Sequence, residues 1–362
     1  MGDWMIYGAT GYTGKLVAEE AVRRGHKPLL AGRSAAKLRP LAESLGLEYA
    51  VVSLDDADAL AKAVGSVELV YNAAGPFIFT SDPILKACLQ TGVHYLDITG
   101  EVPVYQNAYS YDAAAREKGI AIIPGVGFDV LPSDSLIKYV ANQMPDALYL
   151  EVAVDALAGG SGGSANDGLS AGTAKSMVEL LPTIGTLERR NTKLETLRMG
   201  SGQRKVRFPH ATKTVMPASW GDVEVAYRTT GIPNIKVYLS LPPMLMTLSP
   251  IFGSLLVNLL KIKSVRNFAS RQIERMLPGP SEKTRLEGRS AVYVSVRNGK
   301  GETREAWLET LEGYQFTMIA GVRVVERVLD GNFKGALTPS QAFGADFVLE
   351  IEGTTRYDSL PS

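Results

Sequence analysis

The fold is decided by the stretch Trp4-Met5-Ile6-Tyr7-Gly8-Ala9-Thr10-Gly11-Tyr12-Thr13-Gly14-Lys15-Leu16-Val17, in which an apolar strand ends in three glycines and a helical pattern follows. Gly8 permits a tight turn, Gly11 lets the backbone approach a pyrophosphate, and Gly14 lets the helix pack closely on the sheet. The spacing is G-x-x-G-x-x-G, whereas the commonest dinucleotide fingerprint is G-x-G-x-x-G. We predict that a diphosphate is bound at the N-terminus of a helix over about 13–24. The residues expected to bind it are Gly8, Thr10, Gly11, Tyr12, Thr13 and Gly14.

The end of the second expected strand, 27–32, distinguishes between the two nicotinamide dinucleotides. An acidic residue at this place would bind the ribose 2′-hydroxyl of NAD, and the sequence has none there. Arg33 and Ser34 stand at the strand end and Lys37 follows one helical turn later, which offers a guanidinium, a hydroxyl and an ammonium to a 2′-phosphate. The sequence therefore favours NADP(H) as the cofactor. The alternative is a set of surface residues that bind no ligand.

Composition and charge exclude several classes of protein. The chain has 362 residues, of which 45% are hydrophobic and 21% charged, and this is typical of a globular protein of two domains. Lysine plus arginine equals aspartate plus glutamate at 38 each, so net charge gives no reason to expect nucleic acid as a partner. A single cysteine, Cys88, and three histidines without metal-ligand spacing predict no metal site. One cysteine and a first strand close to Met1 favour a cytoplasmic protein without a signal peptide.

The alternation of short apolar runs with helical patterns in the first third predicts βαβ units and a parallel sheet. We expect an α/β protein in which residues 1–131 form a Rossmann domain with a doubly wound parallel sheet. Its strands are expected at about 3–8, 27–32, 47–52, 67–72, 93–98 and 119–124.

The pattern changes beyond about residue 134 and predicts a second, α+β domain over 132–334 with a mostly antiparallel sheet. We expect helices near 134–143, 172–181 and 313–330, and strands near 148–156, 204–208, 222–228, 235–241, 290–297 and 304–311.

One stretch of the second domain, 237–260, carries no charged residue. Pro242 and Pro243 should start a helix over 244–260, which at 1.5 Å per residue is roughly 26 Å long, marginal for a bilayer core of ~30 Å. Three alternatives remain for this helix: burial in a domain or dimer contact, contact with a lipid surface or an acyl chain, and a membrane span.

The fourth expected strand ends in small residues, where larger side chains would collide with a cofactor that crosses the sheet edge. We predict that Asn72, Ala73, Ala74, Gly75, Pro76 and Phe77 line the cofactor near its ribose and nicotinamide.

Candidate catalytic residues lie at the end of the fifth strand, where an open parallel sheet binds its ligand. Tyr95 and Asp97 alternate with Leu96 and so share one face of that strand. Tyr95 could donate a proton to an enolate or amine, with Asp97 or Glu101 orienting it. The alternative is structural: Tyr95 packs at the domain seam and Asp97 binds loop amides.

Together these motifs resemble the saccharopine dehydrogenase-like oxidoreductases, the branch that contains trans-acting enoyl reductases. The blocks that carry the resemblance are 8–14, 31–34, 72–77, 94–101 with Cys88 and Gly92, 125–134, Gly172-Thr173, Gly313-Tyr314, Thr338-Pro339 and 342–344. The resemblance implies an NADP-binding Rossmann domain, a second domain for substrate contacts and homodimer formation, and a C-terminal segment, about 335–362, that returns to the first domain.

We therefore predict an NADP(H)-dependent oxidoreductase that reduces a C=C or C=N bond in a small, largely apolar substrate. One alternative is a non-catalytic NADP-binding sensor or scaffold. The other is a membrane-associated, lipid-handling reductase that contacts a membrane surface through 244–260.

Overall fold

The computed structural model describes residues 3–156, 170–197, 201–240, 253, 255, 257–277 and 279–360. The chain divides into two compact units. The first consists of Met1–Phe128 and Phe316–Ala342, and the second of Asp129–Gln315 and Phe343–Ser362.

The first unit is built on a parallel sheet of seven strands in the order β15-β6-β5-β4-β1-β2-β3. All six strands predicted for this domain are present. Most of them are short apolar runs that a parallel sheet buries on both faces, whereas the edge strand at 49–51 is partly exposed. The strands are β1 (Trp4–Tyr7), β2 (Leu29–Gly32), β3 (Tyr49–Val51), β4 (Leu69–Asn72), β5 (His94–Asp97), β6 (Ala121–Ile123) and β15 (Gly335–Ala336).

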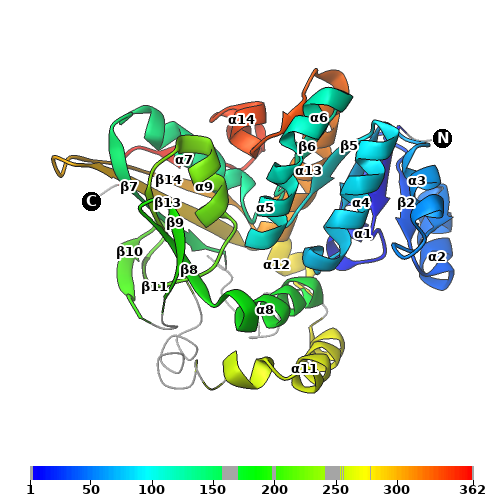
Figure 1. Cartoon of the computed structure of the whole chain (residues 1–362), viewed down its shortest axis with the longest axis horizontal. Coiled ribbons are helices and arrows are strands. Elements are labelled where there is room, and N and C mark those ends of the chain that lie inside the picture. The colour runs from blue at the N-terminus through cyan, green and yellow to red at the C-terminus, as the bar shows by residue number, and fades with distance from the viewer. Residues whose placement is uncertain are drawn as a thin grey trace. The chain divides into compact units, whose positions relative to one another are not determined.

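Helices connect these strands, as expected for a doubly wound fold (Figure 1). They are α1 (Tyr12–Arg23), α2 (Ala35–Leu45), α3 (Ala57–Val64), α4 (Phe77–Thr91), α5 (Val102–Ser110) and α6 (Asp112–Lys118).

A late helix, α13 (Gly313–Asp330), also packs in the first unit from Phe316 onward, although we expected it in the second domain. Gly321 lies so close to Tyr71 of β4 that an added Cβ would be 3.0 Å from Cζ of its ring. Glu326 Oε1 lies 3.0 Å from Nε2 of His26. The amphipathic pattern of α13 shows that one face is buried but does not specify the partner.

The second unit contains a mixed sheet in which β12 is parallel to β7 and the other pairs are antiparallel. Its main path is β10-β11-β12-β7-β13-β14-β16, and β8 joins β12 to β9. The strands are β7 (Ala147–Asp155), β8 (Thr186–Arg190), β9 (Lys193–Leu197), β10 (Arg204–Arg207), β11 (Thr212–Pro217), β12 (Asn234–Ser240), β13 (Arg289–Asn298), β14 (Thr303–Leu311) and β16 (Thr355–Tyr357).

The helical elements of this unit include two, α7 and α9, that contact each other and the sheet. They are α7 (Leu131–Asn142), α8 (Ala171–Ile184), α9 (Asp222–Thr230), α11 (Lys263–Met276), α12 (Glu282–Glu287), α14 (Pro339–Phe343), which crosses the unit boundary, and the 3₁₀ helix η1 (Phe347–Glu350).

The C-terminal segment divides between the units. Gly335 and Ala336 pair with β6 in the first unit, as expected for a returning segment. The residues after Phe343 do not return, because β16 pairs with β14 in the second sheet.

The strand expected at 222–228 is a helix, α9, and that prediction is wrong. Valines at 223 and 225 suggest the alternation of a strand. The first helical turn nevertheless contains Glu224, whose negative charge interacts favourably with the N-terminal end of the helix dipole. Gly231 ends the helix in the left-handed region, with φ +72°, and its amide bonds the Tyr227 carbonyl.

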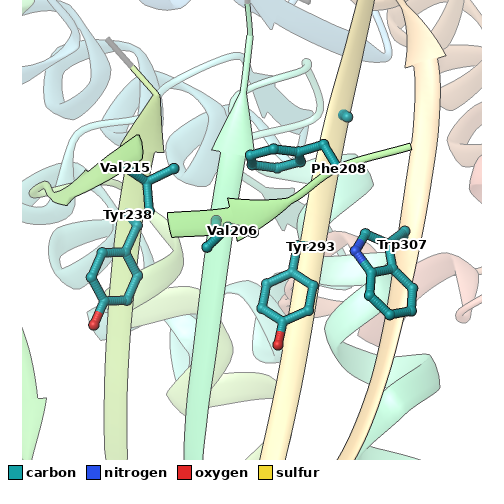
Figure 2. Close-up of a cluster of buried hydrophobic side chains, with 8 residues drawn as sticks. Val206, Phe208, Val215, Tyr238, Tyr293 and Trp307 are labelled. Carbon is teal, nitrogen blue, oxygen red and sulfur yellow. The ribbon is translucent and has the colours of Figure 1, made fainter. Parts of the chain in front are cut away.

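An aromatic cluster forms a core on one face of the second sheet. Figure 2 shows β10, which carries Val206, lying across the sheet between Tyr238 and Tyr293, with Phe208 just beyond its end and Trp307 on the neighbouring strand. The indole of Trp307 donates a hydrogen bond of 2.8 Å to the carbonyl of Arg207, which fixes β10 over the sheet.

Most of the apolar stretch 244–260 lies outside the described residues. Within the described part of the chain, no helix combines the length and the apolar character needed to cross a membrane.

Candidate nucleotide-binding site

The turn between β1 and α1 has the geometry that its glycines predict. Gly8 has φ +84°, and an added Cβ would lie 2.7–2.8 Å from atoms of Ala74, so both conformation and space require glycine. A Cβ on Gly14 would overlap the Gly8 carbonyl oxygen and lie 2.9 Å from Cα of Ala9. The start of α1 therefore abuts the turn directly, and this brings together Gly8, Thr10, Gly11, Tyr12, Thr13 and Gly14.

The N-terminus of α1 lacks the groups that would normally satisfy it. Gly11 occupies the N-cap position, no side chain caps it, and the first turn contains no acidic residue. Gly11 and Thr10 are exposed. In the part of the chain that the structure describes, the positive end of this helix dipole therefore meets neither a capping side chain nor an acidic residue of its own first turn, which suits the binding of a pyrophosphate.

The three residues predicted to select NADP lie where β2 meets α2. Arg33 and Lys37 are exposed, and neither is paired with a carboxylate in the described part of the chain. Ser34 is the N-cap of α2, but its hydroxyl makes no capping hydrogen bond. A guanidinium, an ammonium and a hydroxyl are therefore free to bind a phosphoryl group.

The predicted cofactor-lining segment 72–77 is organised by Asn72. Its side chain is buried, with Oδ1 accepting from the Ala74 amide at 3.0 Å and Nδ2 donating to the Tyr95 hydroxyl at 3.2 Å. Thr80 closes the turn by donating to the Ala74 carbonyl at 2.5 Å. The buried side chain of Asn72 thus fixes the conformation of the loop. The loop residues Ala73, Ala74, Gly75 and Pro76 remain accessible to solvent.

Glu101 has a role that sequence analysis missed. Its Oε1 accepts from the Phe77 amide at 2.9 Å and its Oε2 from the Ile78 amide at 2.7 Å, so it neutralises the N-terminus of α4. We considered it only as a partner of Tyr95. Because 23 residues separate Glu101 from Ile78, no local sequence pattern indicates this contact. The carboxylate makes the N-terminus of α4, unlike that of α1, a poor site for a phosphate.

Tyr95 and Asp97 are joined by a hydrogen bond of 2.8 Å from the phenol to Oδ2, and both are buried. Asp97 Oδ1 accepts from the amides of Thr99 at 3.0 Å and Gly125 at 2.9 Å. Burial raises the pKa of Asp97 to about 6, against the opposing effect of these hydrogen bonds. Burial and the neighbouring Asp97 charge hold the pKa of Tyr95 well above its usual range.

Two further residues of the first unit have structural roles. Asp56 caps α3 by accepting from the Ala59 amide at 3.0 Å. Cys88 is buried, and burial raises the pKa of its thiol, which disfavours the reactive thiolate. The described residues contain no group of His, Cys, Asp or Glu that could hold a metal ion.

A hydroxyl cluster in the second unit joins two blocks that are distant in the sequence. Tyr314 OH lies 3.0 Å from Thr173 Oγ1 and accepts from the Ser170 amide at 2.7 Å. Burial raises the pKa of Tyr314 to about 12. No local sequence pattern predicts this contact, because it joins residues 141 positions apart.

The fold and the site define a Rossmann-type dinucleotide-binding protein with a second α+β unit. Residues 4–123 match the family model described as the saccharopine dehydrogenase NADP binding domain, and this match indicates NADP as the cofactor. The uncapped α1 terminus fits that cofactor, as do Arg33 and Lys37, which have no carboxylate partner among the described residues.

Curated relatives match only part of the chain. A saccharopine dehydrogenase-like oxidoreductase of Mus musculus is 34% identical over 164 residues, which cover 40% of this chain and 38% of that protein. A trans-acting enoyl reductase of Mycobacterium tuberculosis is 36% identical over 140 residues, covering 36% of this chain and 34% of that protein. The match therefore spans less than two fifths of either relative.

Solved structures match the whole fold at low identity. Saccharopine dehydrogenase (L-Glu forming) of Saccharomyces cerevisiae has a TM-score of 0.65 and 13% identity, covering 97% of this chain and 96% of that one. Homospermidine synthase of Legionella pneumophila, solved in complex with NAD, has a TM-score of 0.67 and 9% identity, covering 99% and 91%. At these identities the likeness shows the fold alone.

Proposed function

We propose that this chain is an NADP(H)-dependent oxidoreductase that reduces a C=C or C=N bond in a small, largely apolar molecule. The observation that carries the proposal is the uncapped N-terminus of α1 together with two exposed cations at the end of β2, Arg33 and Lys37, which pair with no carboxylate among the described residues. The name of one relative, trans-acting enoyl reductase, supports reduction of a C=C bond. Bound NADPH would supply the hydride.

Two roles remain for Tyr95 and Asp97 in this reaction. Their burial and the hydrogen bonds from the Thr99 and Gly125 amides support a positioning role, in which Asp97 ties the ends of β5 and β6 together beneath the cofactor loop. The second role is proton donation by Tyr95. Its raised pKa makes it a weak acid, so this role requires a strongly basic acceptor on the substrate.

The proposal is tested by hydride transfer from NADPH deuterated at C4. The full chain is incubated with a panel of enoyl thioesters, enones and imines, and products are analysed for deuterium by mass spectrometry. Deuterium in a reduced C=C or C=N product is the expected result. Tight NADPH binding without transfer to any class would overturn the proposal and favour the non-catalytic NADP-binding sensor or scaffold.

A further inference from the structure

The end of the uncharged stretch and the helix that follows it expose several large apolar side chains. Leu255 is 58% exposed, Leu259 44%, Ile262 51%, Phe268 64% and Met276 60%. Single exposed apolar residues are ordinary, but a group of five between positions 255 and 276 indicates a surface that contacts something other than water.

Helix α11 has one face attached to its own unit and another that is exposed. Arg266 forms an ion pair of 3.2 Å with Glu179 of α8, and the two helices lie in contact (Figure 1). Phe268, Arg271 and Arg275 follow one another at i, i+3 and i+7 and so share a face, and all three are exposed. The attached face is therefore distinct from the face that carries Phe268.

Positive charge accompanies this apolar surface. Residues 257–277 contain a single acidic residue, Glu274. The cationic residues in the same range are Lys261, Lys263, Arg266, Arg271 and Arg275. Guanidinium groups beside an exposed phenylalanine are typical of helices that lie in the plane of a membrane interface.

We propose that α11, with the exposed residues from Leu255 to Ile262, binds the surface of an anionic lipid bilayer. Phe268 and the aliphatic side chains enter the boundary between headgroups and acyl chains, while Arg271 and Arg275 contact lipid phosphates. A bilayer fits better than an acidic protein, because the exposed apolar side chains are spread along the segment from 255 to 276 and five basic residues are interspersed among them. The proposal is independent of the reaction at the nucleotide site.

Co-sedimentation of the full chain with vesicles tests this proposal. Vesicles of phosphatidylcholine alone are compared with vesicles that also contain phosphatidylserine, at low and high salt. We expect partition into the anionic vesicles to be about tenfold stronger than into neutral ones, and to weaken at high salt because surface charges are screened. Reversing two charges in the variant R271E/R275E should reduce this partition by about tenfold or more. Phe268→Ser should weaken binding at both salt concentrations.

A matched control separates this site from net charge. Lys62 and Lys300 are exposed and lie far in the sequence from α11, so K62E/K300E makes the same change of charge elsewhere. This control should bind vesicles as the unmodified chain does. All variants should have the melting temperature and the NADPH affinity of the unmodified chain. Equal partition into neutral vesicles, full binding by R271E/R275E, or equal loss in the control would overturn the proposal. No sedimentation of the unmodified chain would also overturn it and favour a protein partner.

Discussion

The phenol of Tyr95 donates a hydrogen bond of 2.8 Å to Asp97, and Asp97 in turn accepts the amides of Thr99 and Gly125. Two neighbouring strand ends of the parallel sheet, β5 and β6, are thus held by one buried carboxyl group. Asn72, at the end of β4, completes the arrangement by donating to the same phenol. The loops that surround the predicted nicotinamide position therefore depend on a single hydrogen-bonded network.

Asp97 should make the stability of the chain depend on pH. Burial raises its pKa from 3.8 to about 6, so the folded state holds the proton more tightly than the unfolded chain. The stabilisation that comes from protonated Asp97 is fully present below the pKa of the unfolded chain. It is lost as the pH rises through the pKa of the folded state. Between pH 4 and 7 the free energy of unfolding should fall by about 2 kcal/mol more in the unmodified chain than in Asp97→Asn.

Urea denaturation across this pH range measures the difference. Asp58→Asn is the matched control, because Asp58 is exposed on α3, and its curve should run parallel to that of the unmodified chain. Parallel curves for Asp97→Asn as well would contradict the prediction.

Tyr95→Phe distinguishes proton donation from positioning. Loss of a proton donor should reduce kcat by about 10²-fold or more with cofactor affinity unchanged. Loss of a positioning group should leave kcat within a few-fold and reduce stability by about 1 kcal/mol, since one buried hydrogen bond disappears. Single-turnover kinetics with NADPH, together with denaturation, separate the two roles. Unchanged kinetics and stability would exclude both.

Glu101→Gln should destabilise the start of α4. The carboxylate accepts two backbone amides, from Phe77 and Ile78, and hydrogen bonds to charged groups are stronger than those to neutral ones. Because glutamine presents one carbonyl oxygen and no charge, we expect a loss of about 1–2 kcal/mol in the free energy of unfolding. Glu43→Gln, at an exposed position on α2, serves as the control. A loss no greater than that of the control would refute the capping role.

Arg33→Asp should change cofactor preference. The substitution replaces a phosphate-binding cation with a repelling anion, so the ratio of NADPH to NADH affinity should fall by more than about tenfold. Titration calorimetry with both cofactors measures this ratio, and Lys62→Asp controls for net charge. If the ratio stays the same in Arg33→Asp, the 2′-phosphate is bound elsewhere.

Gly11→Val should abolish cofactor binding while the fold persists. An added Cβ at Gly11 would meet only the Gly8 carbonyl oxygen, at 3.3 Å, so the turn can accept it with a loss of about 1 kcal/mol. Its side chain would occupy the place where the pyrophosphate must approach. Gly14→Ala is the contrasting variant, because its Cβ overlaps backbone and should destabilise the first unit. Retained NADPH affinity in Gly11→Val would show that the diphosphate does not bind at this turn.

The sequence by itself determined the parallel sheet, the glycine turn and the cations at the end of β2. These features are local: apolar runs specify buried strands, glycine spacing specifies the turn, and Arg33 follows directly on its strand. All six predicted strands of the first unit therefore agree with the structure. The prediction of a strand at 222–228 was wrong, because a short alternation of apolar and polar residues does not distinguish a strand from the start of a helix.

Only the tertiary structure decided which distant groups meet. Glu101 accepts from an amide of α4, most of α13 belongs to the first unit, and Thr173 contacts Tyr314. Neither the amphipathic pattern of a helix nor the type of a residue identifies such partners. Burial is likewise a property of the folded chain, and it is burial that moves the pKa of Asp97. Hydrophobic pattern is encoded residue by residue, whereas desolvation and long-range contacts depend on how the elements pack.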